Sequence, residues 1–229
     1  MRQFADALFP AYCCLCQWPC PGSLPLCSDC RAELVHNPTC CVRCALPLVT
    51  GNALCGQCLA HPPAFDRVVA PLLYCEYLAF MLGRWKFNGD QSLTPLMADL
   101  WLQGAGISEL PELLVPVPLH WFRRWRRGYT QAEELARRRA LAFDGLQVNK
   151  QLLKRGRATA AQSGMSARQR KRNVRDAFTV SGSCDNLRVA LVDDVLTTGA
   201  TAAEAALALR QAGAARVDIW CLARTPPPQ

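Results

Sequence analysis

The stretch VALVDDVLTTGAT, residues 189–201, sets two adjacent carboxylates, Asp193 and Asp194, directly after an apolar run. Continuous apolar character is typical of a parallel strand that is buried on both faces. Small hydroxyl residues and Gly199 follow the carboxylates, and Thr201 with Glu204 has the spacing of a capping box. The stretch therefore predicts a strand, a loop and a helix that begins near Thr201, with both carboxylates at the carboxyl end of a central strand.

Ligands of open parallel sheets bind at the carboxyl ends of the strands. The predicted loop offers backbone N–H groups to an anion, supported by the helix dipole and by hydroxyl donors. A phosphate held there leaves Asp193 and Asp194 close enough to accept hydrogen bonds from sugar hydroxyls. Phosphate next to a diol indicates a ribose 5-phosphate group. The predicted anion-binding residues are Thr197, Thr198, Gly199, Ala200 and Thr201.

Strand and helix patterns alternate along most of the chain, which predicts an α/β fold with a central parallel sheet flanked by helices. We expect an α/β domain over residues 63–229 and a separate module over residues 1–62. A linker of consecutive prolines, 62–63, separates them. The expected strands cover 65–80 (short strand or hairpin), 112–119, 147–153, 178–181, 187–192 and 216–222, and the expected helices cover 78–87, 94–102, 130–143 and 201–212.

Fourteen cysteines include four Cys-x-x-Cys pairs within the first 58 residues, and a shift of 28 residues superposes the first two pairs on the second two. The module is therefore a duplicated unit. Ten residues separate the two pairs of each unit, which allows four thiolates to converge on one Zn²⁺. The sequence predicts two structural zinc ribbons. Their expected ligands are Cys13, Cys16, Cys27 and Cys30 in the first unit and Cys41, Cys44, Cys55 and Cys58 in the second.

Other arrangements of these cysteines stay open at this point. An iron–sulfur cluster or redox disulfides can use the same spacing. A cross-braced module would instead combine the first Cys-x-x-Cys pairs, or knuckles, of both units in one metal site. Cys14, Cys20 and Cys40 lie beside the knuckles and can substitute as ligands.

Basic residues are concentrated in one segment, because sixteen of the 26 lysines and arginines lie between residues 120 and 175. This asymmetry predicts a polyanionic partner, either a phosphorylated small ligand or a nucleic acid. Aromatic residues among the charges suit stacking on the bases of single-stranded DNA, although they equally suit anchoring of a helix. These are Trp121, Phe122, Trp125 and Tyr129.

We expect a cytoplasmic protein without membrane insertion. Residues 1–12 lack the long apolar core of a secretory signal. The most apolar stretch, 68–82, is shorter than the roughly twenty residues that a membrane-spanning helix needs.

Residues 189–201 resemble the phosphoribosyl pyrophosphate (PRPP) signature of type I phosphoribosyltransferases. The whole chain is similar to the competence protein F (ComF) family, most closely to its GntX-type members, which are linked with the use of external DNA. Three further motifs carry the resemblance. They are RRGYTQAEELA from Arg126, RWKFNGD from Arg84, and the spaced set Thr159, Gln162, Arg170, Asn173, Ala177 and Phe178.

The resemblance implies a type I phosphoribosyltransferase-like sheet with an N-terminal double zinc ribbon, acting in DNA uptake or in the use of DNA as a nutrient. Asp193 and Asp194 would hold ribose hydroxyls, and residues 197–201 the 5-phosphate. The turn 115–119, with Val117 and Pro118, matches the pyrophosphate loop, and the basic segment 154–175 matches a flexible lid. Thr130 stands where family members commonly have Asn.

An active phosphoribosyltransferase of nucleotide salvage is the alternative that the resemblance leaves open. Mg²⁺ would then bridge the pyrophosphate and the ribose hydroxyls. The pattern shows no evident general base, since His120 after the proposed pyrophosphate loop is the best placed histidine and suits a structural role as well. The acceptor, the protein partners and the oligomeric state do not follow from the sequence.

Overall fold

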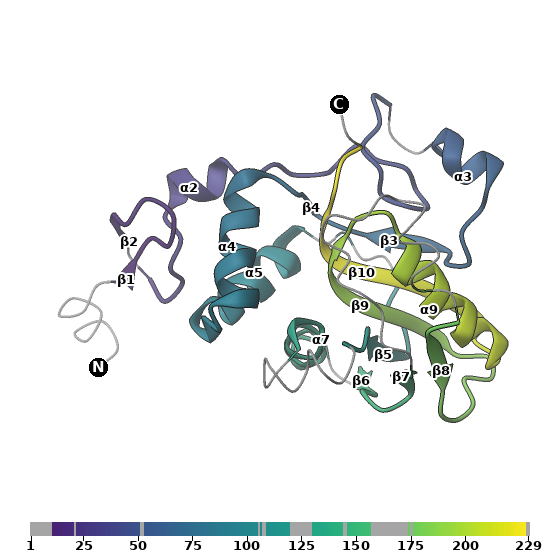
Figure 1. The fold of residues 1–229 in the computed structure, drawn as a ribbon. Helices are drawn as coiled ribbons and strands as arrows, with labels where there is room; N and C mark the ends of the chain where they lie inside the picture. The colour runs from purple at the N-terminus through teal and green to yellow at the C-terminus, as the bar shows by residue number, and fades with distance from the viewer. Residues whose placement is uncertain are drawn as a thin grey trace.

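The computed structural model describes residues 11–20, 22–50, 53–104, 106, 109–119, 130–143, 146–156, 174 and 176–227. Its largest sheet has six strands, and every pairing within it is parallel (Figure 1). The strands are β3 (Arg67–Val69), β4 (Leu72–Leu73), β5 (Leu113–Pro116), β6 (Gln147–Val148), β9 (Arg188–Leu196) and β10 (Arg216–Arg224). Their spatial order is β3-β10-β9-β5-β6, and β4 also pairs with β10.

The two long strands, β9 and β10, form the centre of the sheet because each pairs with a strand on both of its edges, and most of their side chains are buried. Leu191 of β9 lies opposite Ile219 of β10 on one side and opposite Val115 of β5 on the other. Strands buried on both faces have nearly continuous apolar sequences, as residues 189–192 do. The expected parallel sheet flanked by helices is confirmed.

Helices cover both faces of the sheet, as Figure 1 shows. Ala190 and Val192 of β9 pack with α4 (Glu76–Phe87), α5 (Thr94–Gly104) and α7 (Gln131–Leu141). Val189 and Leu191, which point the other way, pack with α9 (Ala200–Gln211). A short 3₁₀ helix, η1 (Gln91–Leu93), joins α4 to α5. Alternate residues of β9 therefore pack against helices on opposite faces of the sheet.

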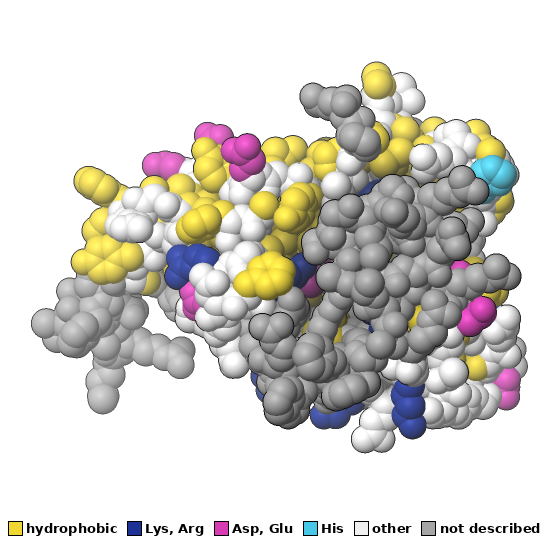
Figure 2. Space-filling view, viewed as in Figure 1, with side chains coloured by type: hydrophobic (Ala, Val, Ile, Leu, Met, Phe, Trp, Pro, Cys, Tyr) yellow, Lys and Arg dark blue, Asp and Glu magenta, His cyan; other side chains and the backbone are white. Residues whose placement is uncertain are grey.

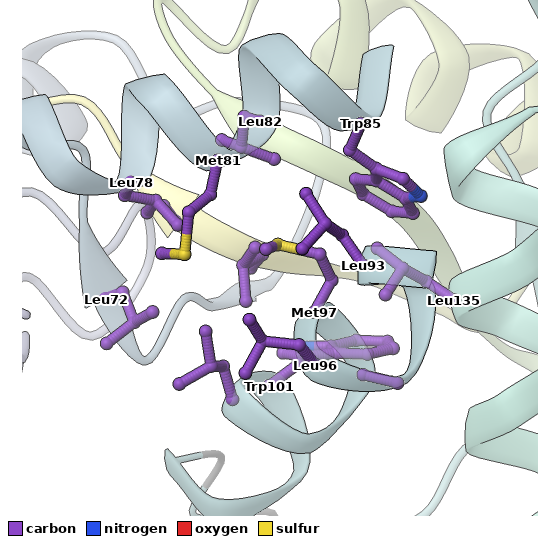
Figure 3. Packing of buried hydrophobic residues seen from close by; sticks show 14 of the residues in the cluster. Leu72, Leu78, Met81, Leu82, Trp85, Leu93, Leu96, Met97, Trp101 and Leu135 are labelled. Carbon is purple, nitrogen blue, oxygen red and sulfur yellow. The ribbon is translucent and has the colours of Figure 1, made fainter. Parts of the chain in front are cut away.

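Large side chains fill the layer between the sheet and helices α4, α5 and α7 (Figure 3). Trp85, Met81 and Leu135 are fully buried there. The rings of Trp101 and Trp220 meet edge to face, with centroids 6.0 Å apart. Edge-to-face contact adds to the free energy of ring burial.

Arg139 of α7 lies in this core, inside a cage of aromatic rings. Its guanidinium carbon is 5.2 Å from the Trp101 ring centre, 5.1 Å from that of Trp220 and 4.7 Å from that of Phe143. Burial lowers the pKa of Arg139 to about 10. Arg139 belongs to the basic segment that the sequence analysis assigned to a polyanionic partner. That interpretation is wrong for this residue, because its charge faces ring electrons within the core.

Three element predictions need correction. The strand predicted over 187–192 continues to Leu196, because β10 pairs with it as far as Arg224. The following helix begins at Ala200, one residue before the predicted start, and its N-cap is Gly199 in place of the predicted capping-box residue Thr201. The strand predicted over 147–153 is divided, because the Asn149 side chain accepts the N–H groups of residues 151 and 152. β6 joins the large sheet, whereas β7 (Leu153–Arg155) pairs antiparallel with β8 (Phe178–Val180).

The N-terminal region holds β1 (Ala11–Tyr12), β2 (Pro19–Cys20), α2 (Ser28–Ala32) and α3 (Gly56–Ala60). The first cysteine unit packs into the cluster of α4 and α5. Of the second unit, Cys40, Cys44 and Ala45 pack into the cluster of α9, whereas Cys41, Cys55 and Cys58 form a small cluster of their own. The Leu73 N–H donates to the Val35 carbonyl at 2.8 Å, so the region also extends the sheet edge. Hydrophobic contacts therefore cross the expected domain boundary at residue 62. The division of the chain into two domains stays a prediction.

Among the described residues, no helix combines the length and the apolar character that crossing a membrane requires.

Trp101→Ala tests the core beneath the sheet. We expect the free energy of unfolding to fall by about 3–5 kcal/mol, because a cavity replaces a ring that contacts Trp220 and Arg139. Urea denaturation followed by circular dichroism measures the loss. Phe80→Ala, on the exposed face of α4, is the control and should change the value by no more than about 0.5 kcal/mol. Equal losses in the two variants would contradict this account of the core.

Candidate functional site

A cavity of about 430 Å³ lies where β5 and β9 end. The structure brings to its wall nine of the residues that the sequence analysis proposed for the ligand. These residues are Val117, Pro118, Asp193, Asp194, Thr197, Thr198, Gly199, Ala200 and Thr201.

The loop between β9 and α9 forms one end of the cavity. Gly199 has a φ of 76°, a left-handed conformation that glycine adopts without strain, and its carbonyl accepts the first helical N–H from Ala203. In the described part of the chain, no group accepts a hydrogen bond from the N–H of Thr197, Thr198 or Gly199. Three neighbouring donors at a helix N-terminus can bind an anion.

Asp193 and Asp194 lie within β9, so their side chains leave opposite faces of the strand. Asp194 lies on the side of α4, where its Oδ2 is 2.8 Å from Lys86 Nζ. Each of these two side chains is only 19% exposed. Asp193 Oδ1 accepts the Asp194 N–H at 2.9 Å. Both carboxylates still line the same cavity, because it opens where the strand ends.

Burial, followed by the charge of Asp194, raises the pKa of Asp193 to about 7. The Asp194 N–H and the cations Lys86 and Arg155 act in the opposite direction. A carboxylate that titrates near neutrality exchanges protons easily, and such groups cluster at functional sites.

Sequence reasoning missed Lys86, Tyr74 and Phe87, which also line the cavity, and it included Arg155 only as part of the basic segment 154–175. Lys86 and Phe87 belong to RWKFNGD, a stretch that carried the family resemblance but received no role. That stretch was the available signal. Tyr74 directly follows the short strand β4, where no motif marks it.

The turn after β5 forms another wall. β5 ends at Pro116, and the Val117 N–H donates to the Val192 carbonyl at 2.9 Å. Thr130 is the N-cap of α7 and accepts the Glu133 N–H at 3.1 Å. Its hydroxyl therefore stabilises the start of α7 at the edge of the cavity.

Several predicted residues lie outside the described part of the chain. Of the basic segment 154–175, only 154–156 and 174 are described. The predicted residues that lie outside the described part include His120, Trp121, Phe122, Trp125, Tyr129, Thr159, Gln162, Arg170 and Asn173.

The eight knuckle cysteines form two groups, each made of one sequence unit. Within each group all four Sγ atoms lie within 4.8 Å of one another. Cys16 and Cys27 are 3.7 Å apart, and Cys44 and Cys55 are 3.6 Å apart. A tetrahedral site with Zn–S bonds of about 2.3 Å has edges of about 3.8 Å. The groups are Cys13, Cys16, Cys27 and Cys30, and Cys41, Cys44, Cys55 and Cys58.

The thiols of each group have the electrostatics of a metal site. Burial opposes ionisation of Cys41, but the N–H groups of Cys55, Cys44 and Arg43 outweigh it and lower the pKa of Cys41 to about 6. Cys13 is held in the same way, again with a pKa of about 6. Burial and the neighbouring thiols raise the pKa of Cys58. A cation at the centre would remove this penalty and let all four ionise.

Cys14, Cys20 and Cys40 lie outside both groups. Cys14 and Cys20 are buried, and the Cys20 thiol donates to the Ala11 carbonyl at 3.4 Å. The two groups are not cross-braced, since neither mixes cysteines of the two units.

A parallel sheet flanked by helices, preceded by two Cys₄ groups, defines an α/β protein with a double zinc ribbon. The family described as "Double zinc ribbon domain" matches residues 4–59. DNA utilization protein YhgH of Salmonella typhimurium is 37% identical over 223 residues, 94% of this chain and 98% of the relative. Competence protein F of Haemophilus influenzae is 37% identical over 208 residues, 87% of this chain and 90% of the relative. The chain belongs to the family of these two proteins.

A crystal structure of purine phosphoribosyltransferase from Pyrococcus horikoshii Ot3 matches with a TM-score of 0.34 and 15% identity, covering 61% of this chain and 73% of that one.

Asp193→Asn tests the electrostatics of the cavity. The pKa of Asp193, about 7, lies above the value of roughly 3.9 for an unfolded aspartate. The folded state therefore holds an extra proton between these values, and the contribution of Asp193 to stability falls as pH rises from about 4 to about 7. We expect Asp193→Asn to gain stability relative to the parent protein over this range, in urea titrations at pH 5, 6, 7 and 8.

Glu76→Gln, which removes an exposed carboxylate on α4, is the control for this titration. A constant stability difference between Asp193→Asn and the parent protein at all four pH values would show that Asp193 does not titrate in this range.

Proposed function

We propose that this chain binds PRPP, or a related ribose 5-phosphate compound, and acts in DNA uptake or in the use of DNA as a nutrient. The observation that carries the proposal is the meeting of three N–H donors and two carboxylates in one cavity. The donors belong to residues 197–199, and the carboxylates to Asp193 and Asp194.

The loop suits a phosphate because its donors are backbone groups at the N-terminus of a twelve-residue helix, α9. The helix dipole favours negative charge at this end. Hydroxyls of Thr197, Thr198 and Thr201 add donors beside the backbone. The 5-phosphate of the ligand would lie against residues 197–201.

The carboxylates suit the sugar because they can only accept hydrogen bonds when ionised, and ribose hydroxyls donate them. Lys86 and Arg155, which border the cavity, would offset the charge of a pyrophosphate near Val117 and Pro118. Oxygen ligands also suit Mg²⁺, which would neutralise the pyrophosphate as it binds. Asp193 and Asp194 are the residues best able to orient such a complex.

The eight knuckle cysteines would serve as zinc ligands with a structural role. All fourteen cysteines are unpaired, which fits a reducing compartment such as the cytoplasm. The names of the relatives supply the biological setting, since one is called a DNA utilization protein and the other a competence protein.

The double variant Asp193→Asn, Asp194→Asn tests the ligand. We expect binding of Mg–PRPP, measured by isothermal titration calorimetry, to be lost, because each substitution replaces one acceptor oxygen by an NH₂ donor and removes the negative charge that faces the metal complex. Zinc content should stay at two per chain, since both Cys₄ groups lie elsewhere. Asp218→Asn, a carboxylate near the start of β10, is the matched control and should bind like the parent protein. Unchanged affinity in the double variant would refute the proposed site.

A second candidate function, a grip on single-stranded DNA, is favoured by the exposed face of α4. Tyr77, Phe80 and Phe87 are 48%, 54% and 75% exposed. Their spacing places them along one helix face, with Arg84 between them. Figure 2 shows hydrophobic side chains gathered over this region with basic ones among them. Phe87 also lines the cavity, so this aromatic stripe of Tyr77, Phe80 and Phe87 extends to the proposed ligand site.

Exposed aromatic rings suit a single-stranded nucleic acid, because every base has a face that stacks on a ring. Here the stripe lies on a chain with a formal net charge of +8. The charge attracts a phosphate backbone, while the rings would bind its unpaired bases.

The triple variant Tyr77→Ala, Phe80→Ala, Phe87→Ala tests this stripe. We expect affinity for a labelled single-stranded oligonucleotide, measured by fluorescence anisotropy, to fall at least tenfold, because stacking contributes about 1–3 kcal/mol per base. The slope of affinity against salt should not change, since no charge is removed. Trp18→Ala, an exposed aromatic of the first ribbon, is the control. Equal affinities of the triple variant and the control would exclude the stripe as a DNA site.

A further inference from the structure

Arg224, the last residue of β10, is only 7% exposed and forms no ion pair with a carboxylate of the described residues. Its guanidinium instead donates to four backbone carbonyls. Nε donates to the Cys44 carbonyl at 3.1 Å. The two N–H groups of Nη1 face three carbonyls, those of Leu196 at 3.0 Å, Thr225 at 2.7 Å and Thr197, so one of its hydrogens is shared between two of them. A buried cation needs such partners in place, because each lost bond leaves a charged donor without water.

The carbonyls that Arg224 binds belong to two functional parts of the molecule. Cys44 is a knuckle cysteine of the second Cys₄ group. Leu196 and Thr197 lie at the start of the loop 197–201, the ligand loop, which is proposed to bind the ligand phosphate. A guanidinium is planar and rigid, so its nitrogens fix the knuckle and the loop relative to each other.

On the side of the loop, Arg224 helps to set where the donors point, together with the Thr225 N–H, which donates to the Leu196 carbonyl at 3.0 Å. The carbonyl of Thr197 and the N–H of Thr198 belong to one planar peptide and point in opposite directions. The same holds for the Leu196 carbonyl and the Thr197 N–H. With both carbonyls turned toward Arg224, both N–H groups point away from it, and no described residue accepts them. Arg224 therefore acts as a positioning residue for the proposed anion site.

On the side of the ribbon, a second buried side chain fixes the same knuckle. The Asn37 Nδ2 donates to the Ala45 carbonyl at 2.9 Å and to the Ala70 carbonyl at 3.3 Å. Ala45 itself is buried with a φ of 55°, a conformation that the tight turn imposes. A ribbon of this size depends on its metal to hold such a turn, so loss of zinc would release the Cys44 carbonyl.

We propose that Arg224 couples the second ribbon to the ligand loop, so that ligand binding at residues 197–201 depends on the metal state of the group Cys41, Cys44, Cys55 and Cys58. The first ribbon has no part in this coupling. The coupling is reciprocal, so a ligand in the loop retards loss of metal from the second ribbon. The identity of that ligand rests on the proposed function, whereas the contact between ribbon and loop does not.

Zinc release from the purified, fully loaded protein tests the coupling. A metallochromic chelator in excess gives the rate, and alkylation of the freed thiols followed by mass spectrometry shows which ribbon opens. Arg224→Lys keeps the charge but loses the rigid fork. We expect its second ribbon to release zinc at least threefold faster than that of the parent protein, with the first ribbon unchanged. Arg216→Lys, near the start of β10, is the matched control, because Arg216 pairs with Glu109 and Asp218.

The reciprocal arm adds Mg–PRPP to the same assay. The ligand should slow zinc release from the second ribbon of the parent protein and of Arg216→Lys at least threefold, and should have no such effect on Arg224→Lys. In calorimetry, Arg224→Lys should bind Mg–PRPP at least tenfold more weakly while circular dichroism stays unchanged.

Equal zinc release from Arg224→Lys and the parent protein, or faster release from both ribbons of the variant, would overturn the coupling. Equal protection by Mg–PRPP in the two proteins would overturn it as well. If the parent protein binds no Mg–PRPP, the proposed ligand is wrong, and the comparison of release rates without ligand still decides whether Arg224 links ribbon and loop.

Discussion

Parallel pairing of β9 with β10 is the constraint on which the rest of the structure depends. Both strands are buried on both faces, so polar groups are accommodated only where the strands emerge from the sheet. The pairing continues to Leu196 and Arg224, which carries Asp193 and Asp194 to the mouth of the cavity while they are still held in the strand. The chain must then turn, and Gly199 provides the conformation that sends it directly into α9. Strand, carboxylates, loop and helix are thus fixed by one ladder of hydrogen bonds.

The two ribbons share a sequence pattern but have different surroundings. The first lies against α4 and α5, where Arg31 pairs with Asp99 at 2.9 Å and Arg84 donates to the Cys14 carbonyl at 3.2 Å. The second lies against the sheet edge and the loop, with Ala45 and Cys44 in the cluster of α9. Small ribbons bury little apolar surface themselves, so each one gains stability from the domain surface as well as from metal. Duplication of the unit therefore gave two modules with separate contacts.

Local signals in the sequence predicted much of this molecule. Cysteine spacing anticipated the two groups, and the apolar run before Asp193 anticipated the central strand. Features that depend on distant residues could not be predicted. The extent of β9 follows from its partner β10, and the start of α9 follows from the backbone of Gly199, whereas Thr201 and Glu204 suggested a later start. Lys86 meets Asp194 only because α4 packs over the sheet. No periodicity within one segment carries that information.

The position of basic residues in the sequence says least about their role, because arginine and lysine side chains occupy three different environments in this structure. Arg139 faces aromatic rings in the core, Arg224 faces carbonyls beneath the loop, and Lys86 faces a carboxylate inside the cavity. The first two are committed to the interior and are unable to reach a partner. Lys86 differs, because its ion pair borders open space and a phosphorylated ligand would compete with Asp194 for it. A phosphate that pairs with Lys86 would release Asp194 from this ion pair. The free carboxylate of Asp194 could then accept a hydrogen bond from a sugar hydroxyl or bind a metal ion.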